Sequence, residues 1–417
     1  MKSKSRSENP LRTSSERAGH SATEEAGIAE DLAVVSLRGE KRFSHPWIFQ
    51  KGIAKPNGKR PQNGSIVDIQ DSEGMWVGRG IYNGHARIAL RILTEREDER
   101  IDIEFFRRRI RAAVELRRTM LELDKVSNAW RVINSEGDGL SGLVVDKFDD
   151  LIVMEFFSSG MYRLKPVIQS VLVEFFPEAR FYWFAEEHVQ KQEAIDVRSP
   201  EIPKPMVIHE HGLKFQITPG GKHKTGFFVD QRDNRKFLST LTPGKSVLDL
   251  CCNSGGFGVY ARALGGATRV TGIDLDETAI ALAQTNARLN KADNEYIHVD
   301  MFHWLRESNE NKTKFDVVVL DPAKLTRTRE EVDKALRKYT DMNRLAIQAT
   351  APGGILLTCS CTGLVPESDF LESIRRAAYQ AKRDVQIFRV SGAAGDHPWN
   401  VQVQEGRYLK AVWARVN

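Results

Sequence analysis

Two cysteines near the C-terminus, Cys359 and Cys361, stand at the end of an apolar segment that is typical of a buried strand. The other two cysteines of the chain, Cys251 and Cys252, also end an apolar segment. Open α/β sheets bind their ligands where the strands reach their carboxyl ends. We therefore expect at least one of these thiols to take part in chemistry.

Residues 249–258 are typical of the turn that joins a first strand to its helix in a cofactor-binding domain. Gly255 and Gly256 allow the backbone to approach a ligand closely. A helix that begins near Phe257 would add free N–H donors at its N-terminus. The sequence therefore predicts a cofactor at this turn.

Acidic residues end the next two predicted strands. Asp274, which is followed by Leu275, can accept hydrogen bonds from both hydroxyls of a ribose. Asp300, which is followed by Met301, is well placed to contact an adenine ring. Both positions predict a cofactor that contains adenosine.

This spacing alone does not separate NAD from S-adenosylmethionine. The turn is not a G-x-G-x-x-G motif, because Cys251 and Asn253 stand where glycines would be expected. S-adenosylmethionine has no pyrophosphate to hold, so a looser turn suffices and this cofactor is favoured. An NAD-dependent oxidoreductase and a scaffold without a cofactor are the alternatives.

A fourth predicted strand ends in Asp321 and Pro322. An acid and a proline at this edge border the substrate pocket in methyltransferases that act on amino or ring positions of bases. The same dipeptide is also a common strand terminator, so by itself it is a weak indication.

The composition is that of a globular protein, with 417 residues, 41% hydrophobic and 28% charged. This length predicts two or three domains. No apolar run approaches the roughly 20 residues of a membrane helix. Residues 1–30 are polar and predict a disordered tail. Cysteines without a disulfide-like spacing fit a reducing cytoplasm, which is the predicted location.

The rest of the chain divides into four predicted parts. Residues 31–95 show short strands and tight turns, as in a small β-barrel, and residues 96–125 form a basic helical connector. Residues 126–219 form a central α/β domain. Residues 220–417 alternate strand and helix, which predicts a doubly wound, mostly parallel sheet.

The net charge of +5 is modest, but arginines gather in the connector, among them Arg107, Arg108 and Arg111. Basic clusters favour a polyanionic partner such as nucleic acid. A solvated helix face is the alternative.

Several motifs in one order along the chain resemble those of the 5-methylcytosine methyltransferases of bacterial large-subunit ribosomal RNA. The resemblance covers nearly the whole chain after residue 30, and its most specific segment is residues 223–235. The other matching segments are residues 41–49, 134–146, 255–257, 338–343, 360–362 and 396–398.

The resemblance implies a PUA domain that docks RNA, a central α/β domain and a C-terminal Rossmann-like class I methyltransferase domain. It implies S-adenosylmethionine as the cofactor and large-subunit ribosomal RNA as the partner, with no membrane, and it leaves a homodimer open. Together with the turns above, it gives as cofactor-binding residues Lys224, Thr225, Phe227, Asp230, Arg232, Asp249, Ser254, Gly255, Gly256, Phe257, Asp274, Leu275, Asp300, Met301 and Asp321. The expected RNA-binding residues are Lys41, Arg42, His45, Trp47, Arg107, Arg108 and Arg111.

The resemblance places the nucleophile on Cys361. Cys359 is the alternative, because residues two apart on a strand point the same way, and a purely structural role for both is a third reading. A metal site made of the four cysteines is disfavoured, because adjacent cysteines are unusual ligands and the fourth strand should lie between the two pairs. We therefore expect no metal.

A cysteine suits this chemistry because carbon 5 of cytosine is a poor nucleophile. Attack of a thiolate at carbon 6 turns the ring into an enamine whose carbon 5 can take a methyl group, and loss of the carbon 5 proton then releases the thiol. An unperturbed thiol has a pKa of about 8.5, so the site must favour the thiolate. Asp321 would hold the base at N3 and at its amino group, after the base has left its stack.

The chain departs from the family pattern on both sides of the expected base pocket. Ala323 and Leu325 stand where the family has a proline and a phenylalanine, Thr362 replaces a serine, and His223 replaces a glutamine. Because Leu325 supplies no aromatic ring to stack on a base, the sequence does not specify which nucleotide is methylated. Methylation of another base or position, and a non-catalytic RNA-binding assembly factor, are the alternatives to a cytosine-C5 methyltransferase.

Overall fold

The computed structural model describes residues 32–40, 45–55, 58–220 and 226–417. They form two compact units, each described here by itself. The first takes in the described residues up to Arg111, with Phe156–Glu178 and Ala185–Val197, and the second takes in Ala112–Glu155, Ala179–Phe184 and the described part of Arg198–Asn417. Residues 126–219, predicted as one central domain, are thus divided between the units. Within the described ranges, no helix is both long and apolar enough to cross a membrane.

The N-terminal part of the first unit is a five-stranded sheet of order β1-β3-β4-β5-β2. Strands β3, β4 and β5 pair antiparallel, whereas β1 pairs parallel with β3. Buried side chains that include Val67, Ile69 and Leu90 form its core. The strands are β1 (Ala33–Ser36), β2 (Trp47–Phe49), β3 (Ile66–Gln70), β4 (Trp76–Tyr82) and β5 (Ile88–Thr94). The short strands expected between residues 31 and 95 are therefore present.

Distant segments of the first unit are joined to this sheet through the buried side chain of Asn83. Its amide donates to Ser159 Oγ at 3.0 Å and to Glu193 Oε2 at 2.9 Å. Glu193 also forms an ion pair with Arg91 at 3.6 Å. These contacts fix α3 (Ser159–Arg163) and α5 (Glu187–Glu193), and the same unit contains α4 (Lys165–Phe175).

The basic helix predicted after the barrel is α2 (Ile103–Glu115), which a π-helical turn, Leu116–Met120, continues. Two of its arginines are held by carboxylates. Arg107 pairs with Glu174 at 2.6 Å, and Arg108 pairs with Glu99 at 2.7 Å. Because these charges are balanced locally, the geometry favours a solvated helix face over an RNA contact at both positions.

The second unit contains three sheets. The first has the order β6-β7-β8-β9, with β6 (Ala129–Asn134), β7 (Leu143–Phe148), β8 (Leu151–Phe156) and β9 (Arg180–Phe184). The second is the hairpin of β10 (Met206–Glu210) and β11 (Leu213–Ile217). The third is a seven-stranded sheet of order β14-β13-β12-β15-β16-β18-β17.

The seven-stranded sheet confirms the predicted doubly wound arrangement. Strands β14, β13, β12, β15 and β16 run parallel, and β18 and β17 complete the sheet in antiparallel pairing. As expected, the fourth strand of this region, β15, lies between β12 and β16. The strands are β12 (Ser246–Leu250), β13 (Arg269–Asp274), β14 (Glu295–His298), β15 (Phe315–Leu320), β16 (Thr350–Ser360), β17 (Val385–Ser391) and β18 (Lys410–Val416).

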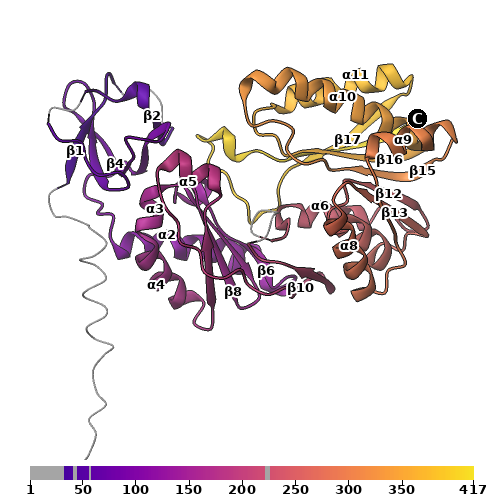
Figure 1. The fold of residues 1–417 in the computed structure, drawn as a ribbon, viewed down its shortest axis with the longest axis horizontal. Coiled ribbons are helices and arrows are strands. Elements are labelled where there is room, and N and C mark those ends of the chain that lie inside the picture. Colours follow the sequence, from indigo (N-terminus) through magenta and orange to yellow (C-terminus); the bar gives the residue numbers. More distant parts are fainter. Residues whose placement is uncertain (1–31, 41–44, 56–57, 221–225) are drawn as a thin grey trace, which may run out of the picture. The chain divides into compact units, whose positions relative to one another are not determined.

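Helices cover both faces of this sheet (Figure 1). Leu248 and Leu250 of β12 pack into one core with residues of α9, α10 and α11, whereas Val247 packs into a second core with residues of α6 and α7. A strand that is buried on both faces has an almost continuous apolar sequence. This is why the apolar segment of β12 predicted a buried strand. The helices are α6 (Arg232–Ser239), α7 (Gly256–Val259), α8 (Glu277–Leu289), α9 (Met301–Glu310), α10 (Val332–Ala349) and α11 (Glu367–Ala381).

Strand β16 has an irregular start. Pro352, Gly353 and Gly354, residues that are typical of a turn, lie within the strand. The pairing with β15 shifts here, from Phe315 opposite Thr350 to Val317 opposite Ile355. The extra residues form a bulge, and Gly353 has the positive φ of 76° that such a bulge accommodates.

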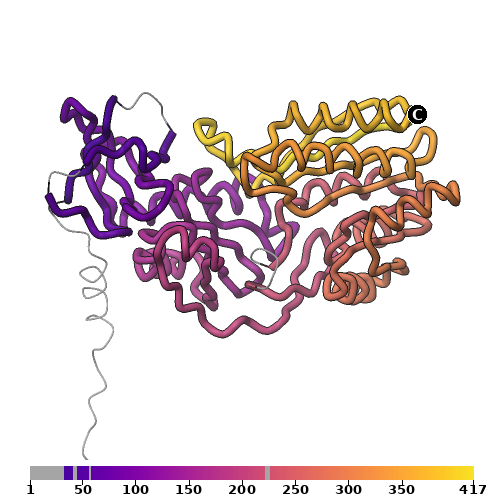
Figure 2. Tube along the Cα trace, turned by 45° about the horizontal axis from the view of Figure 1, so that its top comes forward, coloured from indigo at the N-terminus to yellow at the C-terminus, as the bar shows by residue number. Residues whose placement is uncertain are grey.

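The segment between β17 and β18 leaves the sheet, reaches the four-stranded sheet and returns (Figure 2). At its centre the buried Asp396 accepts a hydrogen bond from the guanidinium of Arg232 at 2.7 Å and from the backbone N–H of Arg131 at 2.9 Å. Arg117 donates to the Asp396 carbonyl oxygen at 2.7 Å. Burial opposes the charged form of Asp396, but His397 and Arg232 outweigh it and hold its pKa well below its usual range.

The buried pair of Asp396 and Arg232 should be essential for stability. We expect Asp396→Asn to lower the free energy of unfolding by about 3–5 kcal/mol, because the buried guanidinium then loses its close countercharge and keeps only the longer ion pair with Asp233 at 3.6 Å. Urea unfolding at neutral pH measures this change. The matched control is Asp150→Asn, which breaks the solvent-exposed pair with Arg180 at 2.7 Å and should cost less than about 1 kcal/mol. Equal losses in the two variants would contradict this assignment.

Candidate active site

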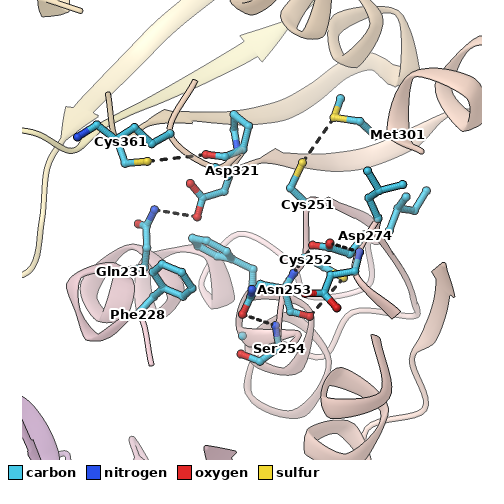
Figure 3. A pocket seen from close by; sticks show the side chains of 18 of the residues that line it. Phe228, Gln231, Cys251, Cys252, Asn253, Ser254, Asp274, Met301, Asp321 and Cys361 are labelled. Carbon is cyan, nitrogen blue, oxygen red and sulfur yellow. Dashed lines mark hydrogen bonds between the residues drawn. The ribbon is translucent and has the colours of Figure 1, made fainter. Parts of the chain in front are cut away.

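A cavity of about 930 Å³ opens at the carboxyl ends of the parallel strands of the second unit. Its walls come from the turns that follow β12, β13, β14, β15 and β16 and from the segment before α6. Figure 3 shows Cys361 and Asp321 on one side of it, with Cys251, Asn253 and Asp274 on the other. The strand ends that the sequence singled out therefore meet in one place.

Three residues of the turn after β12 have a left-handed backbone conformation. Cys251, Asn253 and Gly255 have φ values of 59°, 48° and 76°. A Cβ atom on Gly255 would lie 2.5 Å from the hydroxyl of Tyr296, so this glycine is required by close packing as well as by its backbone conformation. The following residues, Gly256 and onward, begin α7 and leave backbone N–H groups at the cavity.

Asp274, at the end of β13, is held from two sides by backbone donors. Asn253 N–H donates to Asp274 Oδ2 and Asp276 N–H donates to Asp274 Oδ1, both at 2.9 Å. Each carboxylate oxygen has a further lone pair, so the group can still accept hydrogen bonds from two neighbouring hydroxyls. This geometry is suited to a ribose.

The next strand end supplies an apolar wall. Asp300 caps α9 and accepts hydrogen bonds from the N–H groups of Phe302 at 2.9 Å and His303 at 3.1 Å. Met301 and Phe302 line the cavity beside Asp300, and the thiol of Cys251 lies 3.5 Å from the sulfur of Met301. Flat, polarisable surroundings of this kind fit an adenine ring.

Three residues predicted to bind the cofactor do not line the cavity. Arg232 is engaged by Asp396, and Gly255 lies behind the turn against Tyr296. Asp249 is fully buried beneath the turn, where its carboxylate accepts the N–H of Gly258 at 3.0 Å. Burial raises the pKa of Asp249 to about 8. Asp249 and Gly255 thus shape the turn from behind.

The two C-terminal cysteines differ in burial and in access to the cavity. Cys359 is fully buried in the apolar core with Leu357 and Trp413, and burial raises the pKa of its thiol well above the usual value. Cys361 follows the last residue of β16, where the strand geometry ends, and lines the cavity. Its thiol is directed at the carbonyl oxygen of Pro322 at 3.9 Å (Figure 3).

The turn after Cys361 is fixed by polar contacts. The hydroxyl of Thr362 accepts the backbone N–H of Leu325 at 3.2 Å and lies 2.9 Å from the hydroxyl of Tyr339. The buried ammonium group of Lys410 donates to the carbonyl oxygens of Thr362 at 2.8 Å and Val365 at 2.9 Å. Burial lowers the pKa of Lys410 to about 8, although Cys361 acts in the opposite direction. Threonine thus keeps the hydroxyl that links the two walls of the pocket.

Asp321 faces the cavity beside a residue that sequence reasoning did not assign. The side chain amide of Gln231 donates to Asp321 Oδ2 at 3.0 Å (Figure 3). Phe228 and Lys338 also line the cavity and were not assigned. All three lie within matched motifs, so the signal was present, but a motif does not say which of its side chains faces the site.

The remaining predicted residues fall into three sets. Phe227, Asp230, Ser254, Gly256, Phe257, Leu275, Asp300 and Met301 line the cavity. Lys224, Thr225, Lys41 and Arg42 lie outside the described residues. In the first unit, His45 and Trp47 contact each other, with ring centroids 5.1 Å apart, and the guanidinium of Arg91 lies 5.7 Å from the Trp47 ring.

Comparison with known proteins identifies the family. A family described as PUA-like domain matches residues 39–95, and one described as S-adenosylmethionine-dependent methyltransferase matches residues 184–386. Ribosomal RNA large subunit methyltransferase I of Aeromonas salmonicida is 39% identical over 379 residues, which cover 89% of this chain and 95% of that protein. This chain belongs to the ribosomal RNA large subunit methyltransferase I family.

A second member of this family, from Photobacterium profundum, is 37% identical over 377 residues, covering 88% of this chain and 94% of that protein. The fold agrees with a solved methyltransferase in complex with SAH, at a TM-score of 0.78 and 20% identity, covering 92% of this chain and 99% of that one. A methyltransferase structure from Streptococcus mutans gives a TM-score of 0.77 at 18% identity, over 92% of this chain and 100% of that one.

S-adenosylmethionine is therefore the cofactor of this methyltransferase. The cavity fits it. The ends of β12, β13 and β14 provide backbone donors, the oriented carboxylate of Asp274 and the apolar wall beside Met301. We expect Ser254, Gly256, Asp274 and Met301 to contact the cofactor.

The carboxylate of Asp274 should carry much of the affinity for the cofactor. We expect Asp274→Ala to weaken binding of S-adenosylhomocysteine by about 10- to 100-fold, because hydrogen bonds to a charged group are lost. Isothermal titration calorimetry measures this change. Asp293→Ala, at an exposed position before β14, is the matched control and should bind normally. An Asp274→Ala protein that binds as tightly as the control would exclude the ribose assignment.

Proposed function

We propose that this protein forms 5-methylcytosine in large-subunit ribosomal RNA through a covalent adduct between Cys361 and carbon 6 of the cytosine. The observation that carries the proposal is that Cys361 and Asp321 line the same cavity as the cofactor turn. The names of the relatives from Aeromonas and Photobacterium support large-subunit ribosomal RNA as the substrate.

The proposed reaction begins with attack of the Cys361 thiolate on carbon 6, which forms a sulfur–carbon bond and moves the π electrons of the C5–C6 bond toward carbon 5 and the ring. S-adenosylmethionine supplies an electrophilic methyl group on a sulfonium, and carbon 5 takes this group. Removal of the carbon 5 proton then breaks the bond to Cys361 and regenerates the thiolate. The net products are 5-methylcytosine, S-adenosylhomocysteine and a proton.

The position of each reacting group in this proposal follows from the sheet. Val319 of β15 pairs with Leu357 of β16, so the turns that carry Asp321 and Cys361 end side by side. Asp321 would accept hydrogen bonds from the amino group and from protonated N3 of the base, which stabilises positive charge as it develops on the ring. Such a pocket requires a base that has left its stack.

The departures at Ala323 and Leu325 alter the wall of this pocket. Ala323 is exposed, and Leu325 lines the cavity while it packs against the core that contains Tyr339 and Phe370. Leu325 thus offers an aliphatic surface to the base in place of an aromatic ring. Methylation of another base, or of another position on the base, is therefore the alternative that nucleoside analysis of the product has to test.

We propose that the PUA-like region docks the RNA through phosphate contacts of its basic residues, which position a substrate without reading its sequence. The described candidates for RNA contact are His45 and Trp47 of this region, of which only His45 can carry a charge, and the exposed Arg111 of α2. A homodimer and a location in the cytoplasm stay predictions.

Replacement of Cys361 tests the thiol mechanism. Wild-type protein should transfer tritium from labelled S-adenosylmethionine to unmodified large-subunit ribosomal RNA, with 5-methylcytidine as the labelled nucleoside. We expect Cys361→Ala to lower this rate by at least about 1,000-fold, because the covalent step is lost. Cys359→Ala, the matched control in the core, should retain most of the rate.

RNA that contains 5-fluorocytidine gives a second measurement, because fluorine at carbon 5 cannot leave as a proton does. We expect a stable protein–RNA adduct with wild type and with Cys359→Ala, but none with Cys361→Ala. Full methylation by Cys361→Ala would disprove the thiol mechanism. A wild-type protein that transfers no methyl group to any ribosomal RNA would instead favour an assembly factor.

A further inference from the structure

A chain of hydrogen bonds leads from the core of the seven-stranded sheet to the carboxylate of Asp321. The indole N–H of Trp413 donates to Ser391 Oγ at 3.0 Å, and this hydroxyl donates to Asn234 Oδ1 at 2.8 Å. Asn234 Nδ2 donates to Gln231 Oε1 at 2.7 Å. The chain ends where Gln231 Nε2 donates to Asp321 Oδ2 at 3.0 Å.

The direction of this chain is set by groups that have only one role. The indole N–H of Trp413 can only donate, so Ser391 accepts there and offers its own hydrogen to Asn234. Asn234 Nδ2 also donates to the carbonyl oxygen of Gly392 at 3.1 Å, and a carbonyl can only accept. A flipped Asn234 amide would place two acceptors together at this point. The orientation of the Asn234 amide therefore follows from two groups with fixed roles, the indole N–H of Trp413 as a donor and the carbonyl oxygen of Gly392 as an acceptor.

The orientation of Asn234 determines that of Gln231. Because Asn234 presents an N–H to Gln231, the oxygen of the Gln231 amide must face Asn234 and its nitrogen must face Asp321. Both amides are almost completely buried, with exposed fractions of 2% for Asn234 and 3% for Gln231. Reversal would leave buried polar groups unsatisfied, which is costly. Asp321 consequently always meets a donor at Oδ2, and this favours its ionised, accepting form.

We propose that Gln231, Asn234, Ser391 and Trp413 are positioning residues that keep Asp321 a hydrogen-bond acceptor, so that the pocket selects an amino-bearing pyrimidine over a keto pyrimidine. This inference rests on the proposed function. Cytosine offers its amino group and, once protonated, N3 as donors. Uracil offers a carbonyl oxygen in place of the amino group, and an accepting carboxylate repels it.

The selection is tested with two transcripts of the target region that carry cytidine or uridine at the position mapped in wild-type product. We expect wild type to methylate the cytidine transcript and to discriminate against the uridine one. Gln231→Leu should lower kcat/KM on the cytidine transcript by about 10-fold or more, because a hydrogen bond to a charged group is lost. The ratio of kcat/KM on the cytidine transcript to kcat/KM on the uridine transcript should fall by a similar factor.

Ser391 provides the sharper variant, because three hydrogen bonds separate it from Asp321 and it does not line the cavity. Ser391→Ala should lower kcat/KM on the cytidine transcript and reduce the preference for cytidine over uridine, since Asp321 is then less firmly held as an acceptor. Ser391→Thr keeps the hydroxyl and should restore both. Affinity for S-adenosylhomocysteine should be unchanged throughout.

Ser239→Ala is the matched control, because it removes a buried hydroxyl from α6 that bonds only within its own helix, to the Lys236 carbonyl at 2.7 Å. It should behave as wild type. If Ser391→Ala matches Ser391→Thr in rate and in its preference for cytidine, the chain of hydrogen bonds does not position Asp321. If wild type methylates both transcripts equally, the selection is wrong while the methyltransferase function stands. A wild type that methylates no RNA overturns both.

Discussion

The site depends on one constraint, the parallel course of five neighbouring strands. Because β14, β13, β12, β15 and β16 point the same way, every turn at their carboxyl ends opens on the same edge of the sheet. Along the chain, the cofactor turn follows the first of these five strands, β12, and Cys361 follows the last, β16. Their separation by about a hundred residues of sequence therefore has no counterpart in space, and a slip in the pairing of β15 with β16 would separate Asp321 from Cys361.

Hydrogen bonds between buried polar groups fix the orientation of the side chains at this edge. Hydrophobic packing on both faces of the sheet fixes the strands, but it does not orient an amide or a carboxylate. That is done by the contacts of Asp274 with two backbone donors, of Thr362 with the wall that carries Leu325, and of Gln231 with Asp321. Each is a directional interaction in a partly water-excluded place, where the energetic cost of a wrong orientation is high.

The sequence was most informative where apolar periodicity decides the structure. The strands and helices of the seven-stranded sheet lie close to their expected positions, as do the strand ends at Asp274, Asp300 and Asp321. It was least informative where three-dimensional neighbours decide. No local pattern shows that Asp249 lies beneath its turn and not in the cavity, or that Cys359 is buried while Cys361 lines the cavity. Nor does any local pattern show that Arg107 is engaged by a glutamate far along the chain.

The contacts of Asp396 bear on which parts of the chain can be separated from one another. This carboxylate needs the backbone of Arg131 as well as the guanidinium of Arg232, and Arg117 closes over the same loop. A fragment cut at residue 220 would contain every strand of the catalytic sheet and still lack the Arg131 N–H that bonds to this buried carboxylate and the Arg117 guanidinium that bonds to the carbonyl oxygen of Asp396. The compact unit that contains the catalytic sheet is therefore discontinuous in sequence, and it includes the segment from Ala112 to Glu155.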